Sequence, residues 1–155
     1  NALMAHIWDP DVARAAHQAG VGSELDLGLG AKTGWAGETP VPGPWIVEQL
    51  NDGKTVGTGP MAKGWRFNMG LSALLRQDGV RVCVVSGKGQ CLDREQIRLF
   101  GLDPASFRIL ALKSSVHFRA DFAGLARAIF VVTSPGPVTR NLDELTFHRL
   151  APEVR

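Results

Sequence analysis

The chain has 155 residues, of which 45% are hydrophobic and 21% are charged, so its composition is that of one ordinary globular domain. The net charge of +2 gives no reason to expect a nucleic-acid partner. No window approaches the roughly 18 apolar residues of a membrane span, and no signal peptide is visible. Cys83 and Cys91 lack the spacing of a zinc site, which leaves reduced thiols and a cytoplasmic location as the expectation.

The first elements in chain order are a helix, a short strand and a long loop. Asp9 is an expected N-cap, Pro10 suits the first turn, and Gly20 ends the apolar spacing of the helix. Residues 24–29 alternate between polar and apolar side chains, which predicts a strand with one buried face. Glycine, proline and tryptophan dominate residues 30–44, which are expected to form a loop.

Two hairpins are predicted next. Residues 45–50 and 54–58 flank an Asn-Asp-Gly turn, and residues 71–76 and 80–86 flank an Asp-Gly turn. Asn, Asp and Gly tolerate positive φ, which is why these turns favour antiparallel pairing of the flanking strands. The first half of the chain is therefore expected to be mostly antiparallel.

The second half alternates between helices and apolar strands. Helices are expected at residues 94–100 and 116–126, and strands buried on both faces at residues 107–112 and 128–133. Strand, helix, strand, helix, strand is typical of parallel crossover connections. The predicted fold class is α/β, with a mixed sheet made of hairpins first and parallel crossovers afterwards, in a single domain over residues 1–155.

The most informative stretch is a polar turn between residues 107–112 and the helix that follows. It holds Lys113, Ser114, Ser115, His117 and Arg119 within seven residues. Ligands of open α/β sheets bind where a strand hands over to a helix, since free backbone N–H groups favour an anion there. A structural alternative is that the serines cap the helix and the lysine lies along the surface. The turn is the candidate anion-binding or substrate-binding site.

Catalytic motifs are otherwise missing from the chain. The sequence has no HExxH, no nucleophile elbow and no Walker loop, and its four histidines lie far apart. No pair of acid and base, and no complete set of metal ligands, can be assembled from it. The residues alone predict an α/β domain with an anion-binding turn and no metal site of its own.

Five blocks of sequence together form a recognisable pattern. The blocks are Ile-Trp-Asp-Pro with Ala-Ala-His-Gln-Ala-Gly-Val-Gly (residues 7–22), Leu-Gly-Ala-Lys (29–32), Gly-Leu-Asp-Pro (101–104), Lys-Ser-Ser-Val-His-Phe-Arg-Ala (113–120) and Ser-Pro-Gly-Pro-Val-Thr (134–139). They resemble the C-terminal domain of the microcystinase-C-like family of metallopeptidases. Their order and spacing match over nearly the whole chain, and the fourth block is the most diagnostic. Residues 86–92 and 150–155 depart from the family pattern.

The resemblance implies a piece of a zinc-dependent hydrolase that cleaves peptide or related amide bonds. It implies that the metal ligands belong to a larger N-terminal domain that is absent from this chain. That N-terminal domain would be the main partner of this chain. This fragment is then an accessory domain without a cofactor of its own and is inactive alone. In the full-length enzyme, His117 and Arg119 are expected to have supporting catalytic roles. Arg119 would hold a substrate carboxylate, and His117 would donate to an oxyanion or orient a metal-bound water.

Two other functions stay open at this point. The chain could be a non-catalytic module that binds a small anionic or peptide ligand, or a self-sufficient hydrolase with a site assembled from distant histidines. An upstream domain rich in His, Asp and Glu would favour the accessory-domain hypothesis, and metal analysis of the pure chain addresses the self-sufficient hydrolase.

Overall fold

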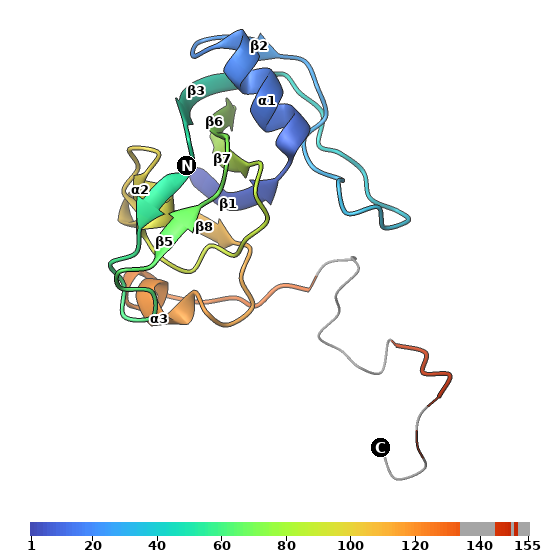
Figure 1. The fold of residues 1–155 in the computed structure, drawn as a ribbon, viewed down its shortest axis with the longest axis vertical. Coiled ribbons are helices and arrows are strands. Elements are labelled where there is room, and N and C mark those ends of the chain that lie inside the picture. The colour runs from blue at the N-terminus through green and yellow to red at the C-terminus, as the bar shows by residue number, and fades with distance from the viewer. Residues whose placement is uncertain (134–144, 150, 152–155) are drawn as a thin grey trace.

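The computed structural model describes residues 1–133, 145–149 and 151, and its centre is a six-stranded mixed sheet (Figure 1). In chain order the elements are β1 (Ala2–Trp8), α1 (Pro10–Ala19), β2 (Glu24–Leu25), β3 (Trp45–Asn51), β4 (Lys54–Val56), β5 (Arg66–Asn68), β6 (Ser72–Gln77), β7 (Val80–Val85), α2 (Glu95–Arg98), the 3₁₀ helix η1 (Pro104–Ser106), β8 (Ile109–Leu112), α3 (Arg119–Phe122) and the 3₁₀ helix η2 (Ala123–Leu125). None of the helices in these described ranges is long and apolar enough to cross a bilayer.

The strand order is β2-β3-β6-β7-β1-β8, so the first strand of the chain lies inside the sheet. β1 runs parallel to β7 on one side, with Ala2 opposite Val80, and parallel to β8 on the other, with Ala5 opposite Leu112. The remaining neighbours, β2 with β3, β3 with β6 and β6 with β7, are antiparallel. The mixed α/β class is confirmed, although no strand was expected at residues 2–8.

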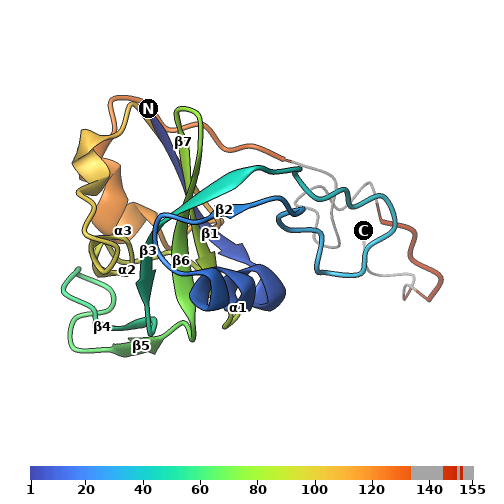
Figure 2. The ribbon, with the colours of Figure 1, turned by 90° about the horizontal axis from the view of Figure 1, so that it is seen from above.

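Helices cover both faces of the sheet (Figure 2). On one face, α1 packs Val12 and Ala16 against a cluster that includes Leu75 of β6 and Val84 of β7. On the other face, Ile97 of α2, Phe122 of α3 and Phe100, just after α2, pack in a cluster with Leu74, Cys83 and Val85. Successive residues of one strand point to opposite faces, so the apolar β6 and β7 supply both cores.

The predicted first helix and second hairpin are confirmed. Asp9 accepts a hydrogen bond from the Val12 amide at 3.1 Å, and Pro10 opens α1. β6 and β7 form a hairpin whose turn places Asp78 at φ +51°. Both features depend on bonds between residues a few positions apart, which explains why the local sequence was sufficient.

The predicted pairing of residues 45–50 with 54–58 is wrong. β3 pairs with β6, and β4 pairs with β5 in a separate two-stranded sheet. The Asn-Asp-Gly bend does form, since Asn51 accepts from the Gly53 amide at 2.9 Å and Asp52 from the Lys54 amide at 3.1 Å. The bend leads the chain out of the large sheet, and β6 takes the place beside β3 that residues 54–58 were expected to occupy. The strand predicted at residues 24–29 is likewise reduced to β2.

The second half holds fewer regular elements than predicted. β8 is an edge strand and not a strand buried on both faces; Ile109 is 65% exposed. The helix expected from residue 116 begins at Arg119, and residues 128–133 form no strand, with Phe130 85% exposed. A strand requires a hydrogen-bonding neighbour, and this apolar run has none in the sheet. The chain from β7 through α2 to β8 therefore makes one connection between parallel strands, and the second predicted crossover is absent from the described ranges.

One ionisable side chain of β1 is buried. His6 is 1% exposed, its Nε2 atom lies 3.3 Å from the Gln96 carbonyl oxygen, and its Nδ1 atom has no partner among the described residues. Burial disfavours the charged imidazolium and lowers the pKa of His6 from 6.5 to about 4, although the bond to Gln96 acts in the opposite direction.

Acid should therefore destabilise the fold through His6. Because the folded-state pKa lies below the unfolded value, the unfolded chain binds more protons as pH falls from 6.5 towards 4, and the free energy of unfolding decreases. The expected loss from this group between neutral pH and about pH 5 is roughly 2 kcal/mol. Urea unfolding gives the free energy of unfolding of the parent chain and of His6→Leu at both pH values. The contribution of His6 is the change between the two pH values in the parent minus the same change in the variant. Equal pH dependence in the two proteins would contradict the assignment.

Candidate functional site

The polar turn lies at the carboxyl ends of the parallel strands β1, β7 and β8. The Lys113 amide still donates to the Ala5 carbonyl of β1 at 2.9 Å, so the turn begins where the ladder between these strands ends. Ser114 is half-buried, and Lys113, Ser115 and His117 are exposed. The sequence-based placement of these residues at the end of a strand is correct, although that strand is at the edge of the sheet.

Gln90 joins two of the predicted site residues. Its Oε1 atom accepts a hydrogen bond from Ser114 Oγ at 3.1 Å and lies 3.1 Å from His117 Nδ1. Ser114 Oγ in turn accepts from the Phe118 amide at 3.2 Å, which closes the turn. Sequence reasoning missed Gln90. The available signal was that it follows β7, whose carboxyl end lies at the same edge of the sheet as that of β8.

The other predicted residues are exposed on the same turn. Neither Lys113 nor Arg119 makes a side-chain hydrogen bond or ion pair with the described residues, and the Arg119 guanidinium lies 5.2 Å from the centre of the Phe118 ring. The backbone amides of Ser115, Val116 and His117 have no partner in these ranges either. Two cations and three backbone donors are thus available to a ligand, and the roles predicted for them stay predictions.

The neighbouring ends of β1 and β7 add an aromatic ring and another cation. Trp8 Nε1 donates to the Ser86 carbonyl at 3.0 Å, and Lys88 Nζ lies 4.0 Å from the centre of the Trp8 ring. Asp9, next in the chain, is fully buried and accepts from the Val12 and Gly30 amides, so it has a structural role. Trp8 and Lys88 therefore lie at the same sheet edge as the turn.

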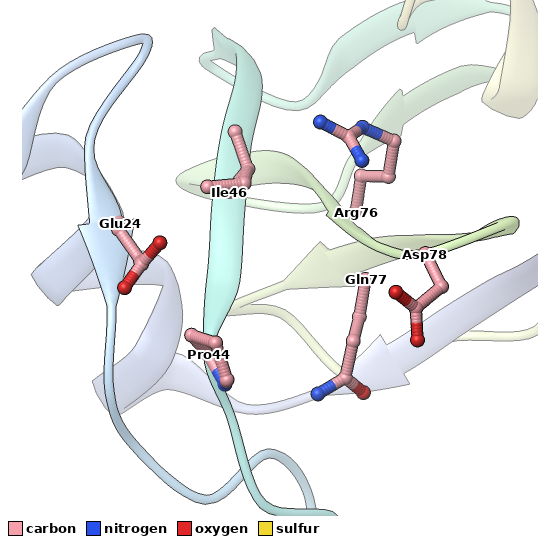
Figure 3. A pocket seen from close by; sticks show the side chains of 6 residues that line it. All are labelled: Glu24, Pro44, Ile46, Arg76, Gln77 and Asp78. Atoms are coloured by element: carbon pink, nitrogen blue, oxygen red, sulfur yellow. The ribbon is translucent and has the colours of Figure 1, made fainter.

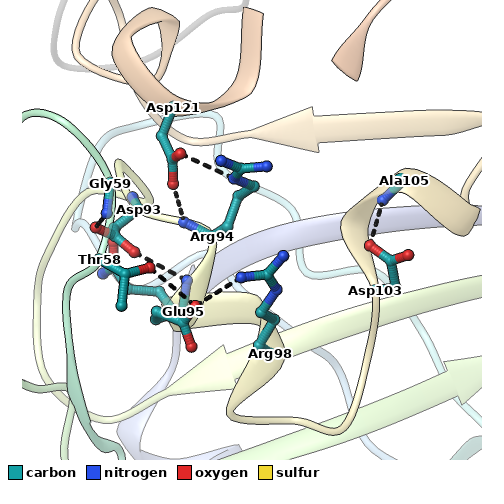
Figure 4. Close-up of polar contacts among 10 residues, drawn as sticks. Thr58, Gly59, Asp93, Arg94, Glu95, Arg98, Asp103, Ala105 and Asp121 are labelled. Atoms are coloured by element: carbon teal, nitrogen blue, oxygen red, sulfur yellow. Dashed lines mark hydrogen bonds and ion pairs between the residues drawn. The ribbon is translucent and has the colours of Figure 1, made fainter. Parts of the chain in front are cut away.

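Two buried carboxylates, Asp121 of α3 and Asp93 just before α2, accept hydrogen bonds close to the start of α2 (Figure 4). Asp121 of α3 accepts from the Arg94 amide at 2.7 Å and from Arg94 Nε at 2.8 Å. Asp93 accepts from the Gly59 amide at 2.9 Å and from the Glu95 amide at 2.9 Å. These bonds attach α3 and the loop before β5 to the start of α2.

Metal ligation is not supported by these residues. No group of three His, Cys, Asp or Glu side chains that could hold a metal occurs in residues 1–133, 145–149 and 151. Cys83 and Cys91 are buried, and burial raises the pKa of both thiols; for Cys91 the nearby charges of Asp93 and Asp121 raise it further. Neutral buried thiols are poor nucleophiles and poor metal ligands.

Two hollows in the surface of the described residues lie away from the polar turn. One of about 220 Å³ is lined by Glu24, Pro44, Ile46, Arg76, Gln77 and Asp78 (Figure 3). It borders the β6–β7 turn, at the opposite end of β7 from Gln90. Arg76 is already paired with Glu48 at 2.8 Å. Open shape and an occupied arginine make this hollow a weaker candidate than the polar turn.

Comparisons with known proteins agree with this architecture. The family model described as "MlrC C-terminus" matches residues 1–149. Microcystinase C from Sphingomonas sp. is 28% identical over 128 residues, which are 83% of this chain and 24% of that protein. A provisionally assigned metallopeptidase from Mesorhizobium sp. BNC1 has the same fold, with a TM-score of 0.74 and 24% identity over 81% of this chain and 25% of the other. The chain thus spans about a quarter of the length of these relatives.

The close approach of the loop to the buried carboxylates can be tested at Gly59. A Cβ atom at this position would lie 2.6 Å from Asp121 Cγ, whereas one at Gly124 would meet nothing within 4 Å, and neither glycine has a positive φ. Gly59→Ala should lower the free energy of unfolding by roughly 1–3 kcal/mol because the carboxylate must move from its donors. Gly124→Ala is the matched control and should change it by less than about 0.5 kcal/mol. Urea unfolding compares the two; equal effects would mean that the loop is not packed as described.

Proposed function

The chain belongs to the MlrC C-terminus family, and on this premise we propose that it is the C-terminal accessory domain of a zinc-dependent peptidase or amide hydrolase. Because the chain spans about a quarter of the length of its relatives, the remaining length of such a protein can hold a linked N-terminal domain, which is the proposed partner. The substrate class is a peptide or another small molecule with an amide bond. A cytoplasmic location, suggested by the free buried thiols, and the absence of a nucleic-acid partner belong to the same proposal.

The observation that carries the proposal is the polar turn at the carboxyl edge of β1, β7 and β8. Its cations Lys113 and Arg119 have no carboxylate partner among the described residues, and His117 is held by Gln90. Catalytic and binding groups of α/β proteins gather at this edge because strand ends and free amides meet there. We assign this turn to one wall of the cleft formed with the N-terminal domain.

Each residue of the turn then has a definite part in binding. Arg119 can donate two parallel N–H bonds to a substrate carboxylate, and Lys113 and the hydroxyl of Ser115 can contact the same anionic group. His117 can form a hydrogen bond with a polar group at the reacting centre. Ser114, whose hydroxyl is engaged with Gln90 and the Phe118 amide, keeps the turn in shape.

Zinc does not fit the residues that the structure describes, which are 1–133, 145–149 and 151. The described ranges offer no ligand set, so a zinc ion would be held by the N-terminal domain, and no step of its chemistry is assigned to residues of the turn. We propose that this domain is inactive alone because it supplies binding and orientation without a metal centre.

A non-catalytic ligand-binding module is the second candidate. The same free cations and backbone amides suit a small anionic ligand or the carboxyl end of a peptide, with no chemistry required. Kinetics of the full-length protein distinguish the two functions, since only an accessory catalytic role makes turnover depend on the turn.

His117→Ala and Arg119→Ala should lower kcat/KM of the full-length protein about a hundredfold. One electrostatic contact in a dry site contributes this much to transition-state stabilisation. Both side chains are exposed, so the free energy of unfolding should change by less than about 0.5 kcal/mol. Hydrolysis assays of a linear peptide and urea unfolding are measured on the same variants.

Arg108→Ala is the matched control, because Arg108 is an exposed arginine outside the turn. It should leave both turnover and stability near the parent values. If His117→Ala and Arg119→Ala also leave turnover unchanged, the accessory catalytic role is wrong. Elemental analysis adds a separate check: about one zinc per 155-residue chain, together with hydrolysis by that chain alone, would favour the self-sufficient hydrolase.

A further inference from the structure

Gln90 stands between two segments that are distant in sequence. It follows β7 and precedes α2, and its side chain reaches the turn after β8. A glutamine that served only to keep the surface soluble would not need its Oε1 atom within hydrogen-bond distance of both the Ser114 hydroxyl and the His117 ring. Its position indicates that Gln90 orients the His117 ring.

The backbone at Gln90 is held by a buried glutamine. Gln96 is 2% exposed; its Oε1 atom accepts from the Leu92 amide at 2.9 Å and from the Asp93 amide at 3.1 Å. Its Nε2 atom donates to the Gln90 carbonyl at 3.0 Å. The loop before α2 is thereby fixed to the helix, and the Gln90 side chain starts from a defined place.

The donors and acceptors around Gln90 Oε1 determine the proton on His117. An amide oxygen can only accept. Ser114 Oγ receives the Phe118 N–H, which leaves its own proton for Gln90. His117 can bond to the same oxygen only if Nδ1 carries the ring proton. In the neutral ring, Nε2 then has a lone pair and no proton, and it has no partner among the described residues.

We propose that Gln90 is a positioning residue that holds His117 in the Nδ1–H tautomer and leaves Nε2 as a hydrogen-bond acceptor. The functional meaning rests on the proposed function, in which His117 faces the cleft. A neutral His117 of this tautomer accepts a hydrogen bond from a water or from an O–H or N–H group of the ligand, and it does not donate to an oxyanion. The ligand class this favours has a hydrogen-bond donor next to an anionic group held by Lys113 and Arg119.

Nitrogen NMR of the ¹⁵N-labelled 155-residue chain tests the tautomer directly, at about pH 8, where histidine side chains are usually neutral. In the parent, His117 Nδ1 should give the protonated-type signal and Nε2 the unprotonated-type signal. Gln90→Leu should abolish this pattern and restore the Nε2–H form that free imidazole favours. Gln90→Glu keeps an acceptor and should retain the parent pattern. Gln77→Leu removes a half-buried glutamine outside the turn, bonded to the Pro42 carbonyl, and should change nothing at His117.

An Nε2–H tautomer in the parent would overturn the proposal, since the Gln90 amide would then present its NH₂ group to His117. An unchanged pattern in Gln90→Leu would overturn it as well.

Activity of the full-length protein gives an independent readout. Gln90→Leu should lower kcat/KM about tenfold, the value of one hydrogen bond, and Gln90→Glu should restore most of it. In a His117→Ala background, Gln90→Leu should cause no further loss, because Gln90 acts through His117. An additive loss would overturn the positioning role. If His117→Ala leaves turnover unchanged, the proposed function fails, while the NMR result still decides the tautomer.

Discussion

Two buried carboxylates, Asp93 and Asp121, organise the face of the sheet on which the candidate site depends. Asp121 accepts two hydrogen bonds from Arg94 and so neutralises its charge, whereas Asp93 accepts one from the Glu95 amide of α2 and one from the Gly59 amide in the loop before β5. A carboxylate without such donors would be costly to bury, so these contacts must form together for the helices to pack. The constraint reaches back to Gly59, where a side chain would meet the Asp121 carboxylate.

The polar turn takes its shape from this arrangement. α3 follows the turn directly, so the bonds of Asp121 hold one end of it, and the edge of β8 against β1 holds the other. The loop before α2 is fixed by Gln96, which brings Gln90 to Ser114 and His117. Phe122, Ile97 and Phe100 pack in one apolar cluster, which holds α2 and α3 against the same face of the sheet. The groups that a ligand would meet are thus supported by these hydrogen bonds and by this apolar cluster.

A turn of this kind combines a well-ordered scaffold with free polar groups. Lys113 and Arg119 are not neutralised within the described chain, and the amides after Ser114 point to no internal acceptor. Such unpaired groups cost the fold little free energy while water solvates them, yet they bind anions strongly once water is excluded. Exclusion of water requires a second surface, which is consistent with a chain that spans a quarter of the length of its relatives.

Local sequence was sufficient wherever a feature depends on residues a few positions apart. The Asp9 cap of α1, the β6–β7 turn and the place of Lys113–Arg119 after a strand all follow from short-range hydrogen bonds and spacing. Pairing between strands is non-local, so an apolar run in the sequence does not show which strand will lie beside it. Tertiary structure alone therefore decided that β1 lies inside the sheet, that β3 joins β6, and that residues 128–133 remain unpaired. It also brought Gln90 to His117, because two loops meet there only after three parallel strands have aligned.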